Sequence, residues 1–161
     1  MKSIEGTLIA VLRIRGEVGV RDQIKQAMNL MKLHRKNRVI LLKNTQSNVG
    51  MINKVKDYCT FGEVDAELVK ELLEKRGRTA GNKQLTADYL KKEAKTDFYS
   101  LSKALVEGKA SMKDIPGLKR YFKMHPPIGG FERGGIKHPY AAGGALGYRG
   151  KEMGKLIQKM I

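Results

Sequence analysis

The stretch Thr7 to Gly16, TLIAVLRIRG, predicts a β-strand with two different faces. Because side chains alternate across a strand, one face is wholly apolar and consists of Leu8, Ala10, Leu12 and Ile14. The other face is apolar in its middle and becomes basic toward Gly16; it consists of Thr7, Ile9, Val11, Arg13 and Arg15. We expect the first face to be covered by a helix and the second to stay open, with both arginines on it. Read in isolation, the two arginines are equally compatible with an ordinary solvated face.

Composition indicates a single compact domain that has a polyanionic partner. A chain of 161 residues is long enough for one sizeable hydrophobic core. Its 32 Lys and Arg residues outnumber its 16 Asp and Glu residues, which gives a net charge of +16. The excess is uneven, since residues 1–60 carry 12 basic and 4 acidic side chains, residues 61–108 carry 9 and 9, and residues 109–161 carry 11 and 3. A neutral scaffold therefore separates two cationic segments.

The first 64 residues alternate between strand and helix patterns. Apolar spacings of three and four predict an amphipathic helix over 20–33, which we expect to cover the apolar face of the first strand. A basic loop, 33–38, leads to a second strand at 39–42, and a helix capped by Ser47 or Asn48 follows. A short third strand at 61–64 completes a βαβαβ order, which is typical of a small α+β sandwich with both helices on one side of the sheet.

The remaining residues predict a helical extension. Asp65 is placed to cap a helix that ends at Gly77, and a basic loop follows at 76–84. Thr86 is placed to cap a short helix and Thr96 or Asp97 a longer one that ends at Gly108, while residues 121–124 favour an added strand. Residues 151–161 form an amphipathic pattern that predicts a helix holding the end of the chain against the body.

A glycine-rich segment, 129–150, interrupts these patterns. It holds eight of the 18 glycines, with scattered basic and aromatic residues and few apolar ones. We expect it to be mobile in the free protein, because so permissive a backbone cannot build a core of its own. Cations and aromatic rings on a glycine-rich backbone are suited to contact with a folded RNA. The alternative is a flexible surface loop that binds nothing.

The sequence offers no arrangement of catalytic residues. The single cysteine, Cys59, cannot form an intrachain disulfide and lies in an apolar context, which favours a buried thiol in a reducing, cytoplasmic compartment. His34, His125 and His138 lack metal-ligand spacing, and GRTAGNK, Gly77 to Lys83, lacks the spacing of a phosphate-binding loop. The short apolar run near the N-terminus is bracketed too closely by charges for a signal peptide or a membrane span.

Several segments together resemble a known family. LIAVLRIRGEVGV, NRVILLKN followed by NVGMINKVKDY, LLEKRGRTAGNKQ, and LKRYFKMHPPIGGF followed by GGIKHPYAAGGALG are similar to the large-subunit ribosomal protein of the universal L-thirty family. The similarity is to its longer archaeal form, whose eukaryotic counterpart is large-subunit protein seven, and it extends over nearly the whole chain.

This resemblance implies a fold and a role. The implied fold is α+β, with a βαβαβ core over 1–64, a three-stranded antiparallel sheet in the order 3-1-2 that is loosely ferredoxin-like, and both helices on one face. The helical and glycine-rich extension over 65–161 is expected to pack with this core as one domain, whereas the short bacterial relatives end near the third strand. The implied role is structural: binding of 23S ribosomal RNA near the 5S RNA during large-subunit assembly.

The predicted partners are therefore 23S ribosomal RNA, with 5S RNA and neighbouring large-subunit proteins as further candidates, and we expect no cofactor, metal, membrane or small-molecule substrate. A regulatory RNA-binding protein and an accessory to RNA processing are the alternatives. Charge and placement select the candidate RNA contacts: Arg13, Arg15, Arg21, His34, Arg35, Lys36, Arg38, Asn48, Lys54, Arg76, Arg78, Lys83, His125, Phe131, Arg133, Lys137, His138, Tyr148, Arg149 and Lys151.

Overall fold

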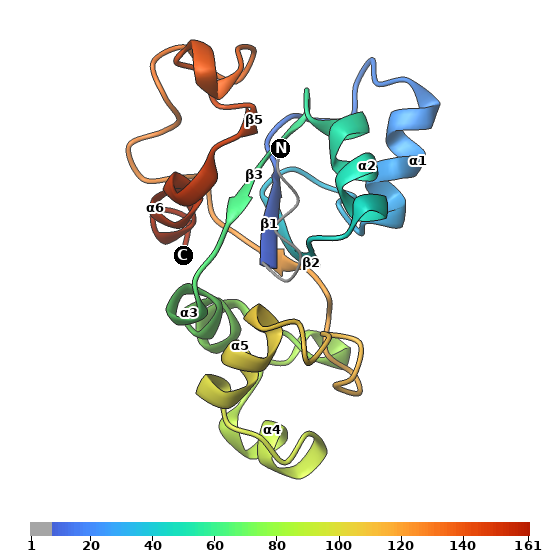
Figure 1. The fold of residues 1–161 in the computed structure, drawn as a ribbon, viewed down its shortest axis with the longest axis vertical. Coiled ribbons are helices and arrows are strands. Elements are labelled where there is room, and N and C mark those ends of the chain that lie inside the picture. Colours follow the sequence, from blue (N-terminus) through green and yellow to red (C-terminus); the bar gives the residue numbers. More distant parts are fainter. Residues whose placement is uncertain (1–7) are drawn as a thin grey trace.

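A computed structural model describes residues 8–161 of the protein. Thr7, assigned above to the second face of the first strand, lies outside these residues. Figure 1 shows a central sheet with α1 and α2 on one side, α6 and the glycine-rich segment on another, and α3, α4 and α5 at one end. The elements are β1 (Leu8–Arg13), α1 (Asp22–Leu30), β2 (Arg38–Lys43), α2 (Gln46–Val55), β3 (Cys59–Glu63), α3 (Ala66–Arg76), the 3-10 turn η1 (Ala80–Asn82), α4 (Ala87–Glu93), α5 (Phe98–Val106), β4 (Phe122–Lys123), η2 (Tyr140–Ala142), β5 (Gly147–Tyr148), η3 (Gly150–Glu152) and α6 (Met153–Gln158).

The sheet has five strands in the order β4-β2-β1-β3-β5. Its three central strands are antiparallel, with β1 in the middle, as predicted from the resemblance. The expectation of a three-stranded, wholly antiparallel sheet was incomplete, because the extension adds a short strand to each edge. β4 pairs antiparallel with Arg38 and Val39 of β2, whereas β5 pairs parallel with Thr60 and Phe61 of β3. The sheet is therefore mixed.

The helices α1 and α2 cover the face of β1 that carries Ile9 and Val11. The prediction that the first helix covers the opposite face was therefore wrong, and so was the prediction that one face stays open. Leu8, Ala10 and Leu12 point into a second and larger hydrophobic cluster built with α3, α5 and α6. A strand that is apolar on both faces is buried on both faces, and the basic residue at its end does not prevent this.

Capping side chains begin two of the helices. Thr45 rather than Ser47 or Asn48 caps α2, since its hydroxyl accepts a hydrogen bond from the backbone N–H of Asn48. Thr86 caps α4 in the same way through the N–H of Tyr89, as predicted. Both are N-cap positions followed by helical residues whose first N–H groups otherwise lack partners.

The extension folds back onto the sheet at several points. α3 packs against α5, and α3 also touches β4. The C-terminal helix α6 places Met153, Leu156 and Ile157 in the hydrophobic cluster of the extension, so it holds the chain end as expected.

Cys59 is fully buried at the start of β3, and this burial raises the pKa of its thiol to about 12.

The glycine-rich segment packs more closely than its composition suggests. Ala145 and Leu146 are buried, and the N–H of Gly134 donates to the carbonyl of Gly143. At Gly144 a side chain would overlap the backbone of His138. Only a glycine at this position lets these two parts of the segment lie so close together. The segment therefore folds on itself and on the sheet edge, whereas its composition predicted a backbone unable to build a core of its own.

Candidate nucleic-acid interface

Three separate segments meet around one basic cleft of about 810 Å³. The turn after β1 contributes Arg15 and Arg21, the end of α2 contributes Lys56, and the glycine-rich segment contributes Lys137. Among the described residues that line the cleft, Asp57 is the one acidic residue. Four cations around one acid make a cleft that attracts anions, and its size accommodates a stretch of sugar-phosphate backbone.

Arg15 is fixed in the wall of this cleft. Its guanidinium lies 5.0 Å from the centre of the Tyr58 ring and donates to the carbonyl of Asp57 at 3.2 Å. The backbone N–H groups of Ile14 and Arg15 both donate to the carbonyl of Tyr58. Because β1 and β3 are antiparallel, the end of one strand lies beside the start of the other, and this pairing brings Arg15 to Tyr58.

Arg13 does not lie on the surface, although it was predicted to. Its side chain is 1% exposed, and it donates to the carbonyls of Leu33 at 2.7 Å and Arg15 at 2.9 Å. The N–H of Asn37 also donates to the Arg13 carbonyl. Arg13 therefore holds the basic loop 33–38 in place from inside, and it leaves the set of candidate RNA contacts.

The loop that Arg13 supports carries three exposed basic side chains, His34, Arg35 and Lys36. Desolvation and the nearby charge of Arg38 lower the pKa of His34, which favours its neutral form. Its Nδ1 lies 2.9 Å from the side-chain oxygen of Asn29. Arg38, at the start of β2, is half-buried with its guanidinium 4.2 Å from the Tyr121 ring centre. Arg35 and Lys36 are thus the permanent charges that this loop offers to solvent.

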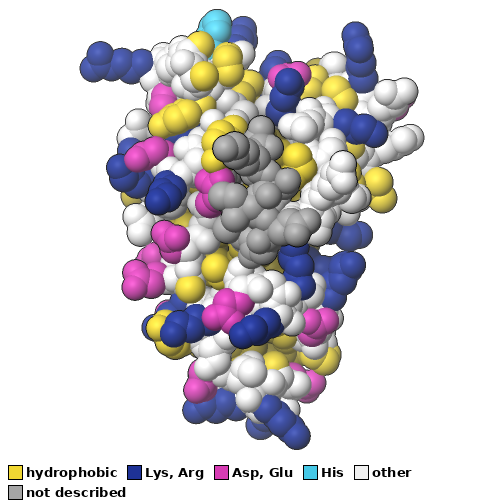
Figure 2. Space-filling view, in the orientation of Figure 1, with side chains coloured by type: hydrophobic (Ala, Val, Ile, Leu, Met, Phe, Trp, Pro, Cys, Tyr) yellow, Lys and Arg dark blue, Asp and Glu magenta, His cyan; other side chains and the backbone are white. Residues whose placement is uncertain are grey.

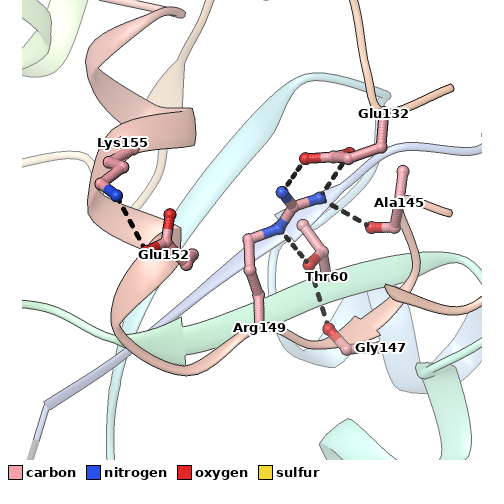
Figure 3. A network of polar contacts seen from close by, with 7 residues as sticks. All are labelled: Thr60, Glu132, Ala145, Gly147, Arg149, Glu152 and Lys155. Atoms are coloured by element: carbon pink, nitrogen blue, oxygen red, sulfur yellow. Dashed lines mark hydrogen bonds and ion pairs between the residues drawn. The ribbon is translucent and has the colours of Figure 1, made fainter. Parts of the chain in front are cut away.

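The glycine-rich segment is fastened to the sheet by Arg149 (Figure 3), another predicted contact that is in fact buried. Its guanidinium forms a two-pronged ion pair with the carboxylate of Glu132, one arm of which measures 2.8 Å. The same group donates to the carbonyl of Ala145 and to the hydroxyl of Thr60 on β3. The ring of Tyr140 lies 4.4 Å from it. This side chain joins four parts of the protein, and four of its five N–H groups donate to protein oxygens.

Two of the aromatic residues predicted to stack on bases are also engaged. Phe131 is half-buried against the hydrophobic cluster of the extension. Tyr148 packs on Phe61 with ring centres 5.8 Å apart, and its hydroxyl donates to Glu63 at 2.6 Å. That hydrogen bond raises the pKa of Tyr148. The Tyr148 side chain is still 47% exposed, so part of its ring surface remains open.

The second basic loop, 76–84, lies apart from the cleft. The guanidinium of Arg76 donates to the carbonyl of Ile161, and the carbonyl of Arg78 accepts the N–H of Lys119. Both arginines are half-buried, whereas Lys83 is exposed. No residue of this loop lines the basic cleft. The loop therefore offers one exposed cation at a separate place.

The structure thus sorts the 20 predicted contacts into three groups. Arg13 and Arg149 are buried. Half-buried are Arg15, Arg38, Asn48, Arg76, Arg78 and Phe131, and exposed are Arg21, His34, Arg35, Lys36, Lys54, Lys83, His125, Arg133, Lys137, His138, Tyr148 and Lys151. Three of them, Arg15, Arg21 and Lys137, come together in the cleft.

Sequence reasoning missed Lys56, Asp57 and Tyr58, which also line the cleft. The antiparallel pairing of β1 with β3 predicts their position, because the residues before β3 must lie beside those after β1. Strand order and direction, rather than composition, would have located them.

Charge on the surface is also uneven. In Figure 2 acidic side chains lie mainly on the left and toward the lower end of the view, while the right side below α1 and α2 shows Lys and Arg.

Among residues 8–161, no three His, Cys, Asp or Glu side chains lie close enough together to hold a metal ion. In the same part of the chain, no helix is long and apolar enough to cross a lipid bilayer.

Comparison with known proteins identifies the family. Residues 9–59 match the model of the family described as ribosomal protein L30p/L7e. The chain is 44% identical over 154 residues to the large ribosomal subunit protein uL30 of Nanoarchaeum equitans, covering 96% of this chain and 99% of that protein. It is 46% identical over 149 residues to uL30 of Methanopyrus kandleri, covering 92% and 100%, and 43% identical over 152 residues to uL30 of Methanococcus vannielii, covering 94% and 98%. The chain belongs to the L30p/L7e family of ribosomal proteins.

Proposed function

We propose that this protein is a structural constituent of the large subunit of the cytoplasmic ribosome. It binds 23S ribosomal RNA near the 5S RNA and supports assembly of the subunit, without a catalytic role. The family supports the ribosomal part of this proposal. The basic cleft supports the RNA-binding part, because it joins cations from three distant segments around a space suited to a phosphate backbone.

The cations of this cleft contribute to RNA binding in two different ways. Arg21, Lys56 and Lys137 are exposed and free to neutralise phosphates, while Arg15 is held in place by Tyr58. Fixed arginines select geometry, whereas flexible lysines contribute mainly attraction. The cleft therefore positions the RNA backbone, and the loop 33–38 adds two more exposed charges nearby in the chain. Shape rather than base sequence is the recognised feature.

A charge-matched pair of variants tests this proposal. One variant carries Arg21→Ala, Lys56→Ala and Lys137→Ala in the cleft. The other carries Lys91→Ala, Lys92→Ala and Lys95→Ala on and after α4, outside the cleft, with the same change in net charge. Filter binding to isolated large-subunit RNA is measured from 50 to 200 mM salt, where contacts to roughly 6 to 10 phosphates would weaken wild-type affinity by about 10³ to 10⁵-fold.

The cleft variant is expected to reduce the slope of log affinity against log salt by about 2, because each lost phosphate contact removes roughly 0.7 to 0.9 from it. The α4 variant should leave the slope nearly unchanged. Equal loss in both variants would mean diffuse attraction by net charge.

Two further experiments test where the protein binds and whether it is ribosomal. Footprinting of the RNA with and without 5S RNA tests the location of the binding site. Retention on large subunits through a high-salt wash tests the ribosomal role, and loss of the protein in the wash would favour a free regulatory protein.

A further inference from the structure

An apolar groove runs along the outside of α1 and α2 and continues beside β2. Its first part has a volume of about 550 Å³, and Ile24, Ala27, Leu30 and Met51 form its apolar lining. Its second part has a volume of about 360 Å³ and shares Leu30 and Met51 with the first. Leu30, the last residue of α1, is 74% exposed although its neighbours Ala27 and Met28 are buried. Leu30 thus extends a contiguous apolar surface, and such surfaces rimmed by polar residues mark interaction sites.

The border of this groove is basic. Arg21 and Lys54 line the first part, and Lys32, Lys43, Lys113 and Arg120 line the second. Neither part has an Asp or Glu among its described lining residues. Two acidic residues stand next to lining residues in the sequence: Asp22 pairs with Lys25 on its own helix at 3.8 Å, and the carboxylate of Asp114 accepts the backbone N–H of Ser111 at 2.7 Å. An apolar floor whose charged lining residues are all cationic is complementary to an apolar segment that carries acidic side chains.

The floor distinguishes this groove from the RNA cleft. The cleft contains Tyr58 and a fixed arginine, whereas the described lining of the groove contains no aromatic ring and is rich in Leu and Met. Aliphatic side chains offer no hydrogen bond or charge to a phosphate, while adaptable methionines suit the irregular surface of a protein. Figure 2 shows hydrophobic side chains exposed among the basic ones on this side of the molecule.

We propose that this groove docks a segment of a neighbouring protein, one that inserts apolar side chains around Leu30 and places acidic side chains against the lysines. The proposal rests on the proposed function, since the neighbour is another protein of the large subunit. Arg21 and Ile24 line both the cleft and the groove, so the two surfaces adjoin along α1. RNA and protein partner would therefore meet on one helix.

Site-specific crosslinking in assembled particles tests the proposal. A benzophenone maleimide is attached to Leu30→Cys or, as the matched probe of the cleft, to Lys137→Cys; the native Cys59 is buried with a raised pKa and stays unlabelled. The labelled full-length protein is reconstituted into large subunits and irradiated. We expect the label at Leu30 to crosslink to an acidic stretch of a ribosomal protein and the label at Lys137 to crosslink to RNA.

The remaining outcomes separate the two proposals. Incorporation with an RNA crosslink from Lys137, but an RNA crosslink or none from Leu30, overturns the docking proposal alone. Failure of incorporation together with loss of the RNA crosslink overturns the proposed function. Leu30→Glu supplies a second measurement, because it repels an acidic segment at an exposed position where folding is not at risk. We expect it to weaken retention on large subunits about tenfold while affinity for isolated RNA is unchanged, and unchanged retention contradicts the proposal.

Discussion

The two faces of the central sheet are covered by different parts of the chain. The side with Ile9 and Val11 is covered by α1 and α2, whose residues lie within about 45 positions of β1. The side with Leu8 and Leu12 is covered by α3, α5 and α6, all of which follow β3 in the chain. The first face depends on local sequence and the second on distant contacts. The extension is therefore part of the hydrophobic core rather than an addition to a finished domain.

The largest effect is expected from Leu12→Asp, on the face that the extension covers. Leu12 is fully buried and belongs to the larger hydrophobic cluster. An unpaired buried charge costs several kcal/mol, which is comparable to a total stability of about 5 to 15 kcal/mol. The variant should lack a cooperative unfolding transition by circular dichroism. Val18→Asp, at a fully exposed position, is the control and should melt like the wild type.

Gly62→Ala tests how closely the extension approaches the sheet. A Cβ at Gly62 would overlap the carbonyl oxygen of Gly150 and come within 2.8 Å of the Met153 side chain. Overpacking of this kind costs about 3 kcal/mol, and urea unfolding should show that loss. Gly50→Ala in α2 meets no atom within 4 Å and should instead stabilise the protein by up to about 1 kcal/mol. Equal effects at the two glycines would contradict the close contact between β3 and η3.

Arg149→Met tests the fastening of the glycine-rich segment. The substitution leaves Glu132 without its ion pair and removes the bonds to Thr60 and Ala145, which should cost about 2 kcal/mol. We also expect faster trypsin cleavage after Arg133 and Lys137, which are exposed. Lys151→Met, an exposed neighbour, is the control. If cleavage is as fast in the wild type as in Arg149→Met, the segment is mobile in the free protein, as its composition first suggested.

The smallest effect is the pH dependence of the same ion pair. The hydrogen bonds from Arg149 lower the pKa of Glu132 below its ordinary value of 4.5. A carboxyl whose pKa is lower in the folded state contributes stability above its unfolded pKa and loses it as pH falls through the folded pKa. The difference in unfolding free energy between wild type and Glu132→Gln should therefore be constant above about pH 5 and shrink below about pH 4.5. Urea titrations from pH 6 to pH 3 measure it, and a constant difference would show that the charge of Glu132 contributes nothing.

The elements of the candidate site were predictable to different degrees. Arg21 and Lys137 were selected from charge and placement and lie together in the cleft. Arg13 and Arg149 were selected on the same grounds, yet both are buried because distant carbonyl and carboxylate oxygens accept their hydrogen bonds. Charge in a sequence does not reveal whether such acceptors will lie nearby. Burial of an arginine is thus a property of the tertiary structure.

The sequence by itself determined the order of the three core strands and their helices, the Thr86 cap, the buried Cys59 and the amphipathic last helix. These features follow from local periodicity and from side chains that bond to their own backbone neighbours. Only the tertiary structure decided which helices cover which face of β1 and which cations reach solvent. Both faces of β1 are apolar, so alternation within the strand cannot choose between them; that choice depends on packing between segments up to 150 residues apart.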